Sequence, residues 1–218
     1  MSYDVSIIIC VYNHEKWIER CVRSILNQNH RTNKNFEAII VNDASTDASL
    51  EIINKFNNEP NITIIDNKKN LGFPASINQA IKLSTGRYIV RVDSDDYIQR
   101  NFIYFMQTFL DMNRFYQAVC VDYLVVNEFE EVLRRENAMK KEIACGIMFR
   151  RECLFDIGLY NEEYKMREGH DLRRRFNKKF KMGHLELPLY KYRDHQENRT
   201  KDKNLKNFDE KLFDEHGS

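Results

Sequence analysis

The chain has 218 residues, of which 42% are hydrophobic and 12% aromatic, enough to bury one substantial core. Its 34 Lys and Arg balance 33 Asp and Glu, and the net charge of +1 excludes a whole-protein field that attracts nucleic acid. No apolar run approaches the ~20 residues that cross a bilayer. We therefore expect a single domain over residues 1–218 without a membrane span.

The apolar segment after the first four residues lacks the basic region and small-residue cleavage site of a secretory signal. The five cysteines are odd in number, and no two of them form a C-x-x-C pair. This pattern predicts buried thiols in a reducing compartment rather than disulfides or a zinc knuckle. We expect a cytoplasmic protein.

The first half alternates between short apolar runs and segments with helical spacing. Residues 6–11 are a continuous apolar run, typical of a strand buried on both faces, and apolar residues from 17 to 26 recur at helical spacing. The same pattern predicts further strands and helices: strands at 36–41, 61–65 and 88–92, and helices from about 47 and from 74 to 86. This alternation predicts a doubly wound, mostly parallel α/β sheet.

The second half is less regular. Its patterns predict a helix at 101–112, a strand at 118–126 that continues into a hairpin across 128–135, a buried strand at 143–149 and a basic helix at 168–180. The charged residues 201–218 are expected to form a peripheral helix or a frayed tail.

Three polar clusters, at residues 12–14, 42–45 and 93–96, each directly follow a predicted strand. In a doubly wound sheet the ligand site lies beyond the carboxyl ends of the strands, so we expect all three at one edge. The third cluster, Asp93-Ser94-Asp95-Asp96, holds three carboxylates in four residues. It is either a solvated turn with helix-capping aspartates or a cation site.

The chain contains neither a P-loop nor a dinucleotide-binding glycine motif, so neither of these grips a phosphate. A divalent cation, Mn²⁺ or Mg²⁺, held by strand-end carboxylates and phosphate oxygens can take that place. The acidic cluster therefore favours a metal-dependent phosphate site.

The order of these segments resembles the family 2 inverting glycosyltransferases of the GT-A fold. Four segments carry the resemblance: Val5–Asn13, Phe36–Asp47, Asn70–Asn78 and Gly86–Asp96. The remainder matches more loosely, through residues 168–172 and 192–200. The resemblance implies a nucleotide-sugar-binding half at about 1–97 and an acceptor-binding half at about 98–200.

Carried over by position, Tyr12, Asn13 and Asp43 would line the base and ribose pocket, with Asp43 accepting from an imide N–H such as uracil presents. This favours a UDP-sugar. Asn70, Gly72 and Asn78 would shape the pocket wall, although Gly72 is equally explained by a turn that needs positive φ. The full set of expected donor-binding residues is Val11, Tyr12, Asn13, Asp43, Asn70, Gly72, Asn78, Arg91, Asp93, Ser94 and Arg199.

The resemblance also implies a metal site. Asp95 would ligate the cation, and His195 resembles a C-terminal histidine that in many relatives completes the metal or diphosphate site. Asp96 is expected to cap the following helix instead. Arg199 and Thr200 would contact phosphate.

The segment Glu168-Gly-His-Asp-Leu172 departs from the family pattern. Many members carry Glu-Asp followed by one residue and Asp-Leu, and the first Asp is usually assigned as the base, but Gly169 stands there. Asp171, Glu168 and His170 remain as candidates, and we expect Asp171. The alternative is that both carboxylates only favour the start of a helix.

These residues together imply a metal-dependent inverting transfer from a nucleoside-diphosphate sugar to a hydroxyl of a saccharide or lipid-linked acceptor, in cell-surface polysaccharide or glycoconjugate synthesis. A non-catalytic nucleotide-sugar-binding module is the alternative that Gly169 favours, and a nucleotidyltransferase is a weaker one because no glycine- and basic-rich loop follows the first strand. The basic segment 167–181 is a solvated helix face, or a contact for anionic lipid at the inner face of a membrane.

Overall fold

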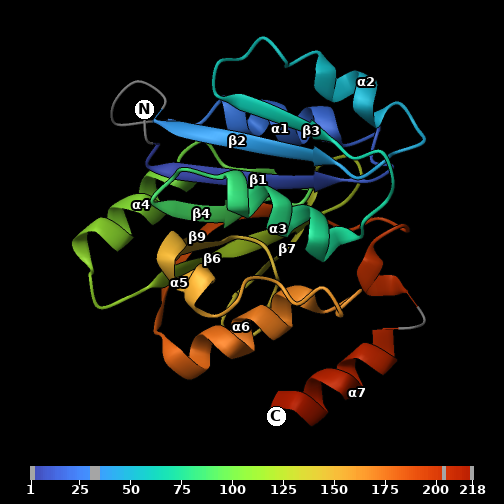
Figure 1. Ribbon diagram of the computed structural model, residues 1–218. Helices are drawn as coiled ribbons and strands as arrows, with labels where there is room; N and C mark the ends of the chain where they lie inside the picture. Colours follow the sequence, from blue (N-terminus) through green and yellow to red (C-terminus); the bar gives the residue numbers. More distant parts are fainter. Residues whose placement is uncertain (1–2, 30–34, 203–204, 217–218) are drawn as a thin grey trace.

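The computed structural model describes residues 3–29, 35–202 and 205–216 (Figure 1). The first half consists of β1 (Val5–Val11), α1 (Ile18–Leu26), β2 (Phe36–Asn42), α2 (Ser49–Asn54), β3 (Ile62–Asp66), α3 (Phe73–Leu83) and β4 (Tyr88–Arg91). Its four strands pair in parallel in the order β3-β2-β1-β4. This is the doubly wound arrangement that the sequence predicts.

Burial explains why these segments take these conformations. Every residue of β1 and β2 is buried, because helices cover both faces of the sheet. The helix α1 turns Ile18, Cys21 and Ile25 inward. It packs beside α2 behind the sheet, whereas α3 lies in front of β1 and β4 (Figure 1).

The second half extends the same sheet. It consists of β5 (Tyr97–Ile98), α4 (Phe102–Met112), β6 (Ala118–Val126), β7 (Val132–Glu136), β8 (Ile147–Arg150), α5 (Arg151–Asp156), α6 (Glu168–Lys179), β9 (Met182–Arg193), the 3₁₀ turn η1 (Arg199–Lys201) and α7 (Leu205–His216). The strand order continues β4-β8-β6-β9-β5, and β7 pairs with β6. β8 runs antiparallel to both of its neighbours, and β9 runs parallel to β6.

The predicted α/β class is confirmed, with some boundaries shifted. The strand expected at 143–149 begins only at Ile147, and the preceding residues 142–145 line a cavity. The helix expected from about 47 begins at Ser49 and ends at Asn54. The hairpin across 128–135 forms between β6 and β7. All five cysteines are buried and free, as expected.

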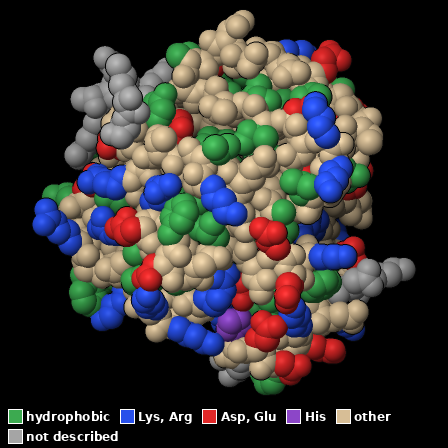
Figure 2. All heavy atoms as spheres, in the orientation of Figure 1, with side chains coloured by type: hydrophobic (Ala, Val, Ile, Leu, Met, Phe, Trp, Pro, Cys, Tyr) green, Lys and Arg blue, Asp and Glu red, His purple; other side chains and the backbone are tan. Residues whose placement is uncertain are grey.

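The basic segment 167–181 makes internal ion pairs that the sequence does not predict. Arg173 lies 3.3 Å from Glu142, and Arg175 lies 2.7 Å from Asp171. Figure 2 shows acidic and basic side chains interspersed on one face of the molecule. No helix within the described ranges is long and apolar enough to span a membrane.

The charged C-terminal segment forms the helix α7, the first of the two expected alternatives, over the part of it that the structure describes. α7 packs against α6, and Asp209 bonds Arg167 at the start of that helix with its closest contact at 2.6 Å. The sequence-predicted tail is therefore part of the fold, next to the segment that was expected to carry the base.

Candidate active site

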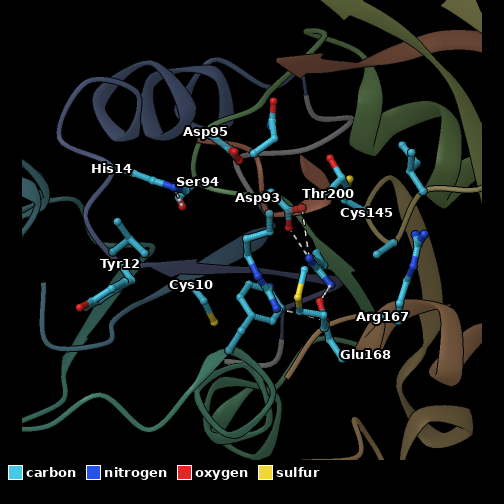
Figure 3. A pocket seen from close by; sticks show the side chains of 18 of the residues that line it. Cys10, Tyr12, His14, Asp93, Ser94, Asp95, Cys145, Arg167, Glu168 and Thr200 are labelled. Atoms are coloured by element: carbon cyan, nitrogen blue, oxygen red, sulfur yellow. Dashed lines mark hydrogen bonds and ion pairs between the residues drawn. The ribbon is translucent and has the colours of Figure 1, made fainter. Parts of the chain in front are cut away.

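The carboxyl ends of β1, β2 and β4 meet at one edge of the sheet, as parallel strands require. The segments before β8 and α6, and the chain after β9, close the opposite side. Together they enclose a cavity of about 580 Å³ (Figure 3). All three polar clusters that follow predicted strands contribute residues to its lining.

Most of the expected site residues line this cavity, which draws on both halves of the chain. They are Val11, Tyr12, Asn13, Asp43, Asn70, Arg91, Asp93, Ser94, Asp95, Glu168, His170, Arg199 and Thr200. Figure 3 shows Tyr12 and His14 on one side and Arg167 and Thr200 on the other. Gly72, Asn78, Asp171 and His195 are not part of the lining.

Tyr12 and Asn13 form the turn at the end of β1. Asn13 has a φ of 56°, a left-handed conformation that asparagine tolerates better than most residues. Its Oδ1 accepts from the Thr46 amide at 2.8 Å, and its own amide donates to Ser45 Oγ at 3.1 Å. These bonds join the β1 and β2 loops, and Tyr12 beside them is 48% exposed and lines the cavity.

Asp43 is buried at the end of β2, and both of its oxygens already have partners. Oδ1 accepts from the Leu71 amide at 2.9 Å and from Asn67 Nδ2 at 3.0 Å, while Oδ2 accepts from the Gly72 amide at 3.0 Å. Asp43 therefore anchors the loop before α3. Because a carboxylate has more than three acceptor positions, it can still accept from a ligand in the cavity.

Two of the expected pocket-wall residues need correction. Gly72 does not line the cavity, and its φ of 88° shows that the alternative reading, a turn that needs positive φ, is correct. Asn78 is buried in α3, where Nδ2 donates to the Tyr160 carbonyl at 2.8 Å and Oδ1 accepts from the Tyr160 amide at 3.0 Å. Asn78 holds the segment after α5 to α3 rather than facing the cavity.

The three aspartates after β4 are tolerated together because each meets a different partner. Asp93 binds Arg91 Nε at 2.5 Å, and Asp95 Oδ2 lies 3.0 Å from His195 Nε2. Asp96 accepts from Tyr190 Oη at 2.7 Å and from the Arg193 amide at 2.8 Å.

Their surroundings give these carboxyls different acidities. Burial would raise the pKa of Asp95, but its hydrogen bond with His195 and the nearby His14 hold that pKa below the ordinary value. Burial, together with the charges of Asp95 and Asp93, raises the pKa of Asp96 well above the ordinary value. The expected helix-capping role of Asp96 is wrong, because β5 follows it and its carboxylate ties the loop to β9.

Asp95 and His195 form a donor set that fits a divalent cation. One carboxylate oxygen and one imidazole nitrogen lie 3.0 Å apart, and Asp95 borders the open cavity. In this structure a hydrogen bond joins the two side chains; a bound cation would replace that hydrogen bond and be held by both. Mn²⁺ accepts such mixed ligands, and substrate oxygens would complete its shell.

Two other groups of close ligand atoms occur among the described residues, and both fit a cation less well. Asp93, Asp96 and Cys145 form the first, and Asp171, Glu215 and His216 form the second. The guanidinium of Arg91 already neutralises Asp93, and that of Arg175 neutralises Asp171. We therefore keep Asp95 and His195 as the metal candidates.

Glu168 begins α6 and faces the cavity, where it lies between two arginines. Its Oε1 lies 3.0 Å from Arg91 Nη1, and its Oε2 lies 3.4 Å from Arg199 Nη2. Burial would raise the pKa of Glu168, but the charges of Arg91 and Arg199 outweigh it and lower the pKa. Glu168 is thus an ionised carboxylate at neutral pH.

Gly169 is required by packing. A Cβ at this position would lie 2.2 Å from the Cβ of Ala144 and 3.3 Å from Arg91 Nη1. The segment before β8 therefore occupies the space that a side chain at position 169 would need. An aspartate cannot enter here unless the segment that carries Ala144 moves.

The expectation that Asp171 is the base needs correction. Its side chain is buried between α6 and α7, where Oδ2 binds Arg175 Nη2 at 2.7 Å and Oδ1 lies 2.9 Å from His216 Nε2. Helical spacing puts residues 168 and 171 on neighbouring positions of α6, but α7 covers Asp171 and the cavity borders only Glu168. His170 lines the cavity, yet burial and the charge of Arg167 lower its pKa to about 4, so it is neutral at pH 7.

Sequence reasoning missed a group of cavity residues, most of which come from connecting segments and the rest from α3, β9 and α7. They are Phe73, Glu142, Ile143, Ala144, Cys145, Lys165, Met166, Arg167, Tyr192, Glu197, Asn198 and Leu205. Most carry no spacing signal. Arg167 stands out only in the structure, by its backbone conformation: its φ of 64° is uncommon for a non-glycine residue at the start of a helix.

A doubly wound sheet whose strand ends combine a nucleotide-sized cavity with an acidic cluster and a buried carboxylate defines a class, the GT-A glycosyltransferases. The family model for glycosyl transferase family 2 matches residues 6–185. The chain belongs to glycosyl transferase family 2.

Similar proteins agree with this classification. A poly(ribitol-phosphate) beta-glucosyltransferase of Bacillus spizizenii is 45% identical over 96 residues, which are 43% of this chain and 15% of that protein. The chain spans less than half of the length of the curated relatives it matches.

Solved structures show the same fold. Staphylococcus aureus TarS 1-349 in complex with UDP-GlcNAc superposes with a TM-score of 0.74 at 23% identity, covering 88% of this chain and 59% of that one. A mannosyltransferase of Pyrobaculum calidifontis in complex with GDP-Man and Mn²⁺ superposes with a TM-score of 0.71 at 15% identity, covering 91% and 59%.

Proposed function

We propose that this chain transfers a sugar, with inversion, from a nucleoside-diphosphate donor to a hydroxyl of a saccharide or lipid-linked acceptor, in cell-surface polysaccharide or glycoconjugate synthesis. One observation carries the proposal. A single cavity is bordered by Tyr12 and Asp43 at one end, by Asp95 with His195 behind it, and by Glu168 opposite. In this proposal the nucleotide base binds beside Tyr12 and Asp43, the diphosphate beside Asp95, and the acceptor hydroxyl beside Glu168.

The donor end favours a uridine nucleotide. Tyr12 offers an exposed ring on which a base can stack, and Asp43 is a pure acceptor for an imide N–H. The UDP and UDP-GlcNAc complexes of TarS support this choice, and the GDP-Man complex of the archaeal mannosyltransferase is the reason to test it.

Asp95 and His195 would hold Mn²⁺ or Mg²⁺, and Ser94, Arg199 and Thr200 lie where they can donate to phosphate oxygens. When bound, the cation supplies charge neutralisation for the departing nucleoside diphosphate. His14 Nδ1 lies 2.7 Å from Ser94 Oγ and so orients that hydroxyl. The proton of the acceptor hydroxyl must then be accepted by a side chain of the protein.

We propose Glu168 rather than Asp171 as the base. A base must be ionised and reach the cavity in which the acceptor would bind; Glu168 lines the cavity, and its lowered pKa leaves it ionised at neutral pH, which supports this choice. It would accept the hydroxyl proton as that oxygen attacks the anomeric carbon from the face opposite the diphosphate. Its neutralisation by Arg91 and Arg199 makes it a weak base in the free protein.

A non-catalytic nucleotide-sugar-binding module is the second candidate. The observation that favours it is the pair of arginines on Glu168 together with Gly169 in the usual place of the base. The two functions share donor binding and differ only in turnover.

The test is to incubate the protein with UDP-sugars or GDP-mannose and Mn²⁺, with and without saccharide acceptors. Both the affinity for the donor and the amount of nucleoside diphosphate released are measured. We expect UDP-sugar affinity that requires Mn²⁺, with nucleotide release that rises on addition of an acceptor. Affinity without any release identifies a binding module, and preference for GDP-mannose refutes the uridine assignment.

A further inference from the structure

Both oxygens of Glu168 are covered by guanidinium groups, and the two contacts are unequal. Arg91 is only 8% exposed and also holds Asp93 through Nε at 2.5 Å and Nη2 at 3.1 Å. Arg199 is 46% exposed, and its contact with Glu168 Oε2 is the longer one at 3.4 Å. Arg91 is a fixed partner of the carboxylate, whereas Arg199 is one that solvent or a ligand can replace.

Arg199 stands where an entering donor would meet it. It begins η1 on the segment after β9, and it lines the cavity beside Thr200. Its guanidinium carbon lies 5.2 Å from the centre of the Phe73 ring, and its Nη2 donates a hydrogen bond to the Lys165 carbonyl oxygen. These contacts guide the side chain along the cavity wall without burying it.

We propose that Arg199 is a donor-released latch on Glu168: the diphosphate of the donor draws Arg199 away from Oε2 and so uncovers the base only when a donor is present. This inference rests on the proposed function, with Glu168 as the base. A guanidinium pairs with phosphate oxygens in the same forked geometry as with a carboxylate, and a diphosphate offers two negative charges where Glu168 offers one. The exchange is one of ion pairs, and no covalent bond changes.

The exchange also increases the basicity of the uncovered carboxylate. Loss of a neighbouring cation raises the pKa of Glu168, while Arg91 stays in place and keeps the group ionised near neutral pH. The titratable and charged groups that face Glu168 from the elements around it are Arg91, Arg199, Tyr160, His170 and Cys10. Of these, Arg199 is the exposed cation that contacts it.

The latch is tested by measuring how residues 168 and 199 are coupled in donor binding. Calorimetry with UDP and Mn²⁺ is performed on the unaltered protein, Glu168→Gln, Arg199→Met and the double variant. Since Arg199 must leave Glu168 to bind phosphate, Glu168→Gln should tighten UDP binding about two- to five-fold, the size of an exposed ion pair. In the Arg199→Met background the same change should have no such effect, although that background itself binds UDP more weakly.

Glu197→Gln is the matched control, because it removes the same charge from the lining of the same cavity. It should alter UDP affinity equally with and without Arg199, which separates release of Arg199 from a general loss of negative charge. Glu168→Gln effects that are equal in the two backgrounds overturn the latch while leaving donor binding intact. Failure of the unaltered protein to bind UDP overturns the proposed uridine donor and the latch together.

Discussion

Substitution of Asp171 should lower the stability of the protein, whereas substitution of Glu168 should lower its turnover. Asp171 is 1% exposed, and its carboxylate binds Arg175 through two contacts at 2.7 and 3.0 Å and His216 at 2.9 Å. Asp171→Asn removes this charge and leaves Arg175 without its ion-pair partner. Breaking a buried pair in this way costs about 3–5 kcal/mol.

The expected cost here is below that range, about 2–3 kcal/mol, because Arg175 is partly exposed and keeps two carbonyl acceptors, Ile157 O at 2.5 Å and Leu159 O at 2.7 Å. For a chain of this size that corresponds to a fall in Tm of about 4–12 °C. Turnover measured below the melting transition should stay near that of the unaltered protein, since Asp171 does not face the cavity.

The assay compares thermal unfolding with nucleotide release for three variants. Asp156→Asn is the control, because its ion pair with Lys179 lies at the surface, and it should change stability by less than about 0.5 kcal/mol. Glu168→Gln should reduce turnover about 10²-fold or more without weakening UDP affinity. An Asp171→Asn variant with unchanged Tm and turnover lowered to that extent would refute this reasoning and restore Asp171 as the base.

Three further outcomes are expected. Asp95→Ala should abolish the Mn²⁺ dependence of UDP binding while changing Tm little, and calorimetry that still shows Mn²⁺-dependent affinity removes Asp95 from the metal site. Gly169→Ala should lower stability by about 1–3 kcal/mol, because its Cβ would meet Ala144 at 2.2 Å, and the added change Ala144→Gly should restore part of it in denaturant titrations. The folded protein lowers the pKa of Glu168 below its ordinary value of 4.5, so the ionised carboxylate stabilises the fold above pH 4.5, and this stabilisation is lost as pH falls through the folded-state pKa. The Tm difference between the unaltered protein and Glu168→Gln should therefore be largest near neutral pH and shrink below pH 4.5. A Tm difference that is constant with pH contradicts the assigned charge.

The sequence by itself determined the first half of the fold and the sheet edge at which the candidate site lies. Continuous apolar runs such as Val5–Val11 can only be buried on both faces, and their alternation with amphipathic helices leaves a parallel sheet as the way to bury both. Topology then brings Tyr12, Asp43 and Asp95 to one edge, because the carboxyl ends of parallel strands lie together.

Only the tertiary structure decided which of these polar groups face the cavity. Glu168 and Asp171 are three positions apart on α6 and equally acidic in sequence, but α7 covers Asp171 while the cavity exposes Glu168 to Arg91 and Arg199. Partners such as these come from segments 31 to 77 residues away, and no local pattern encodes such contacts. Periodicity records which side of an element is apolar; which charge meets which is settled when the two halves of the chain pack against each other.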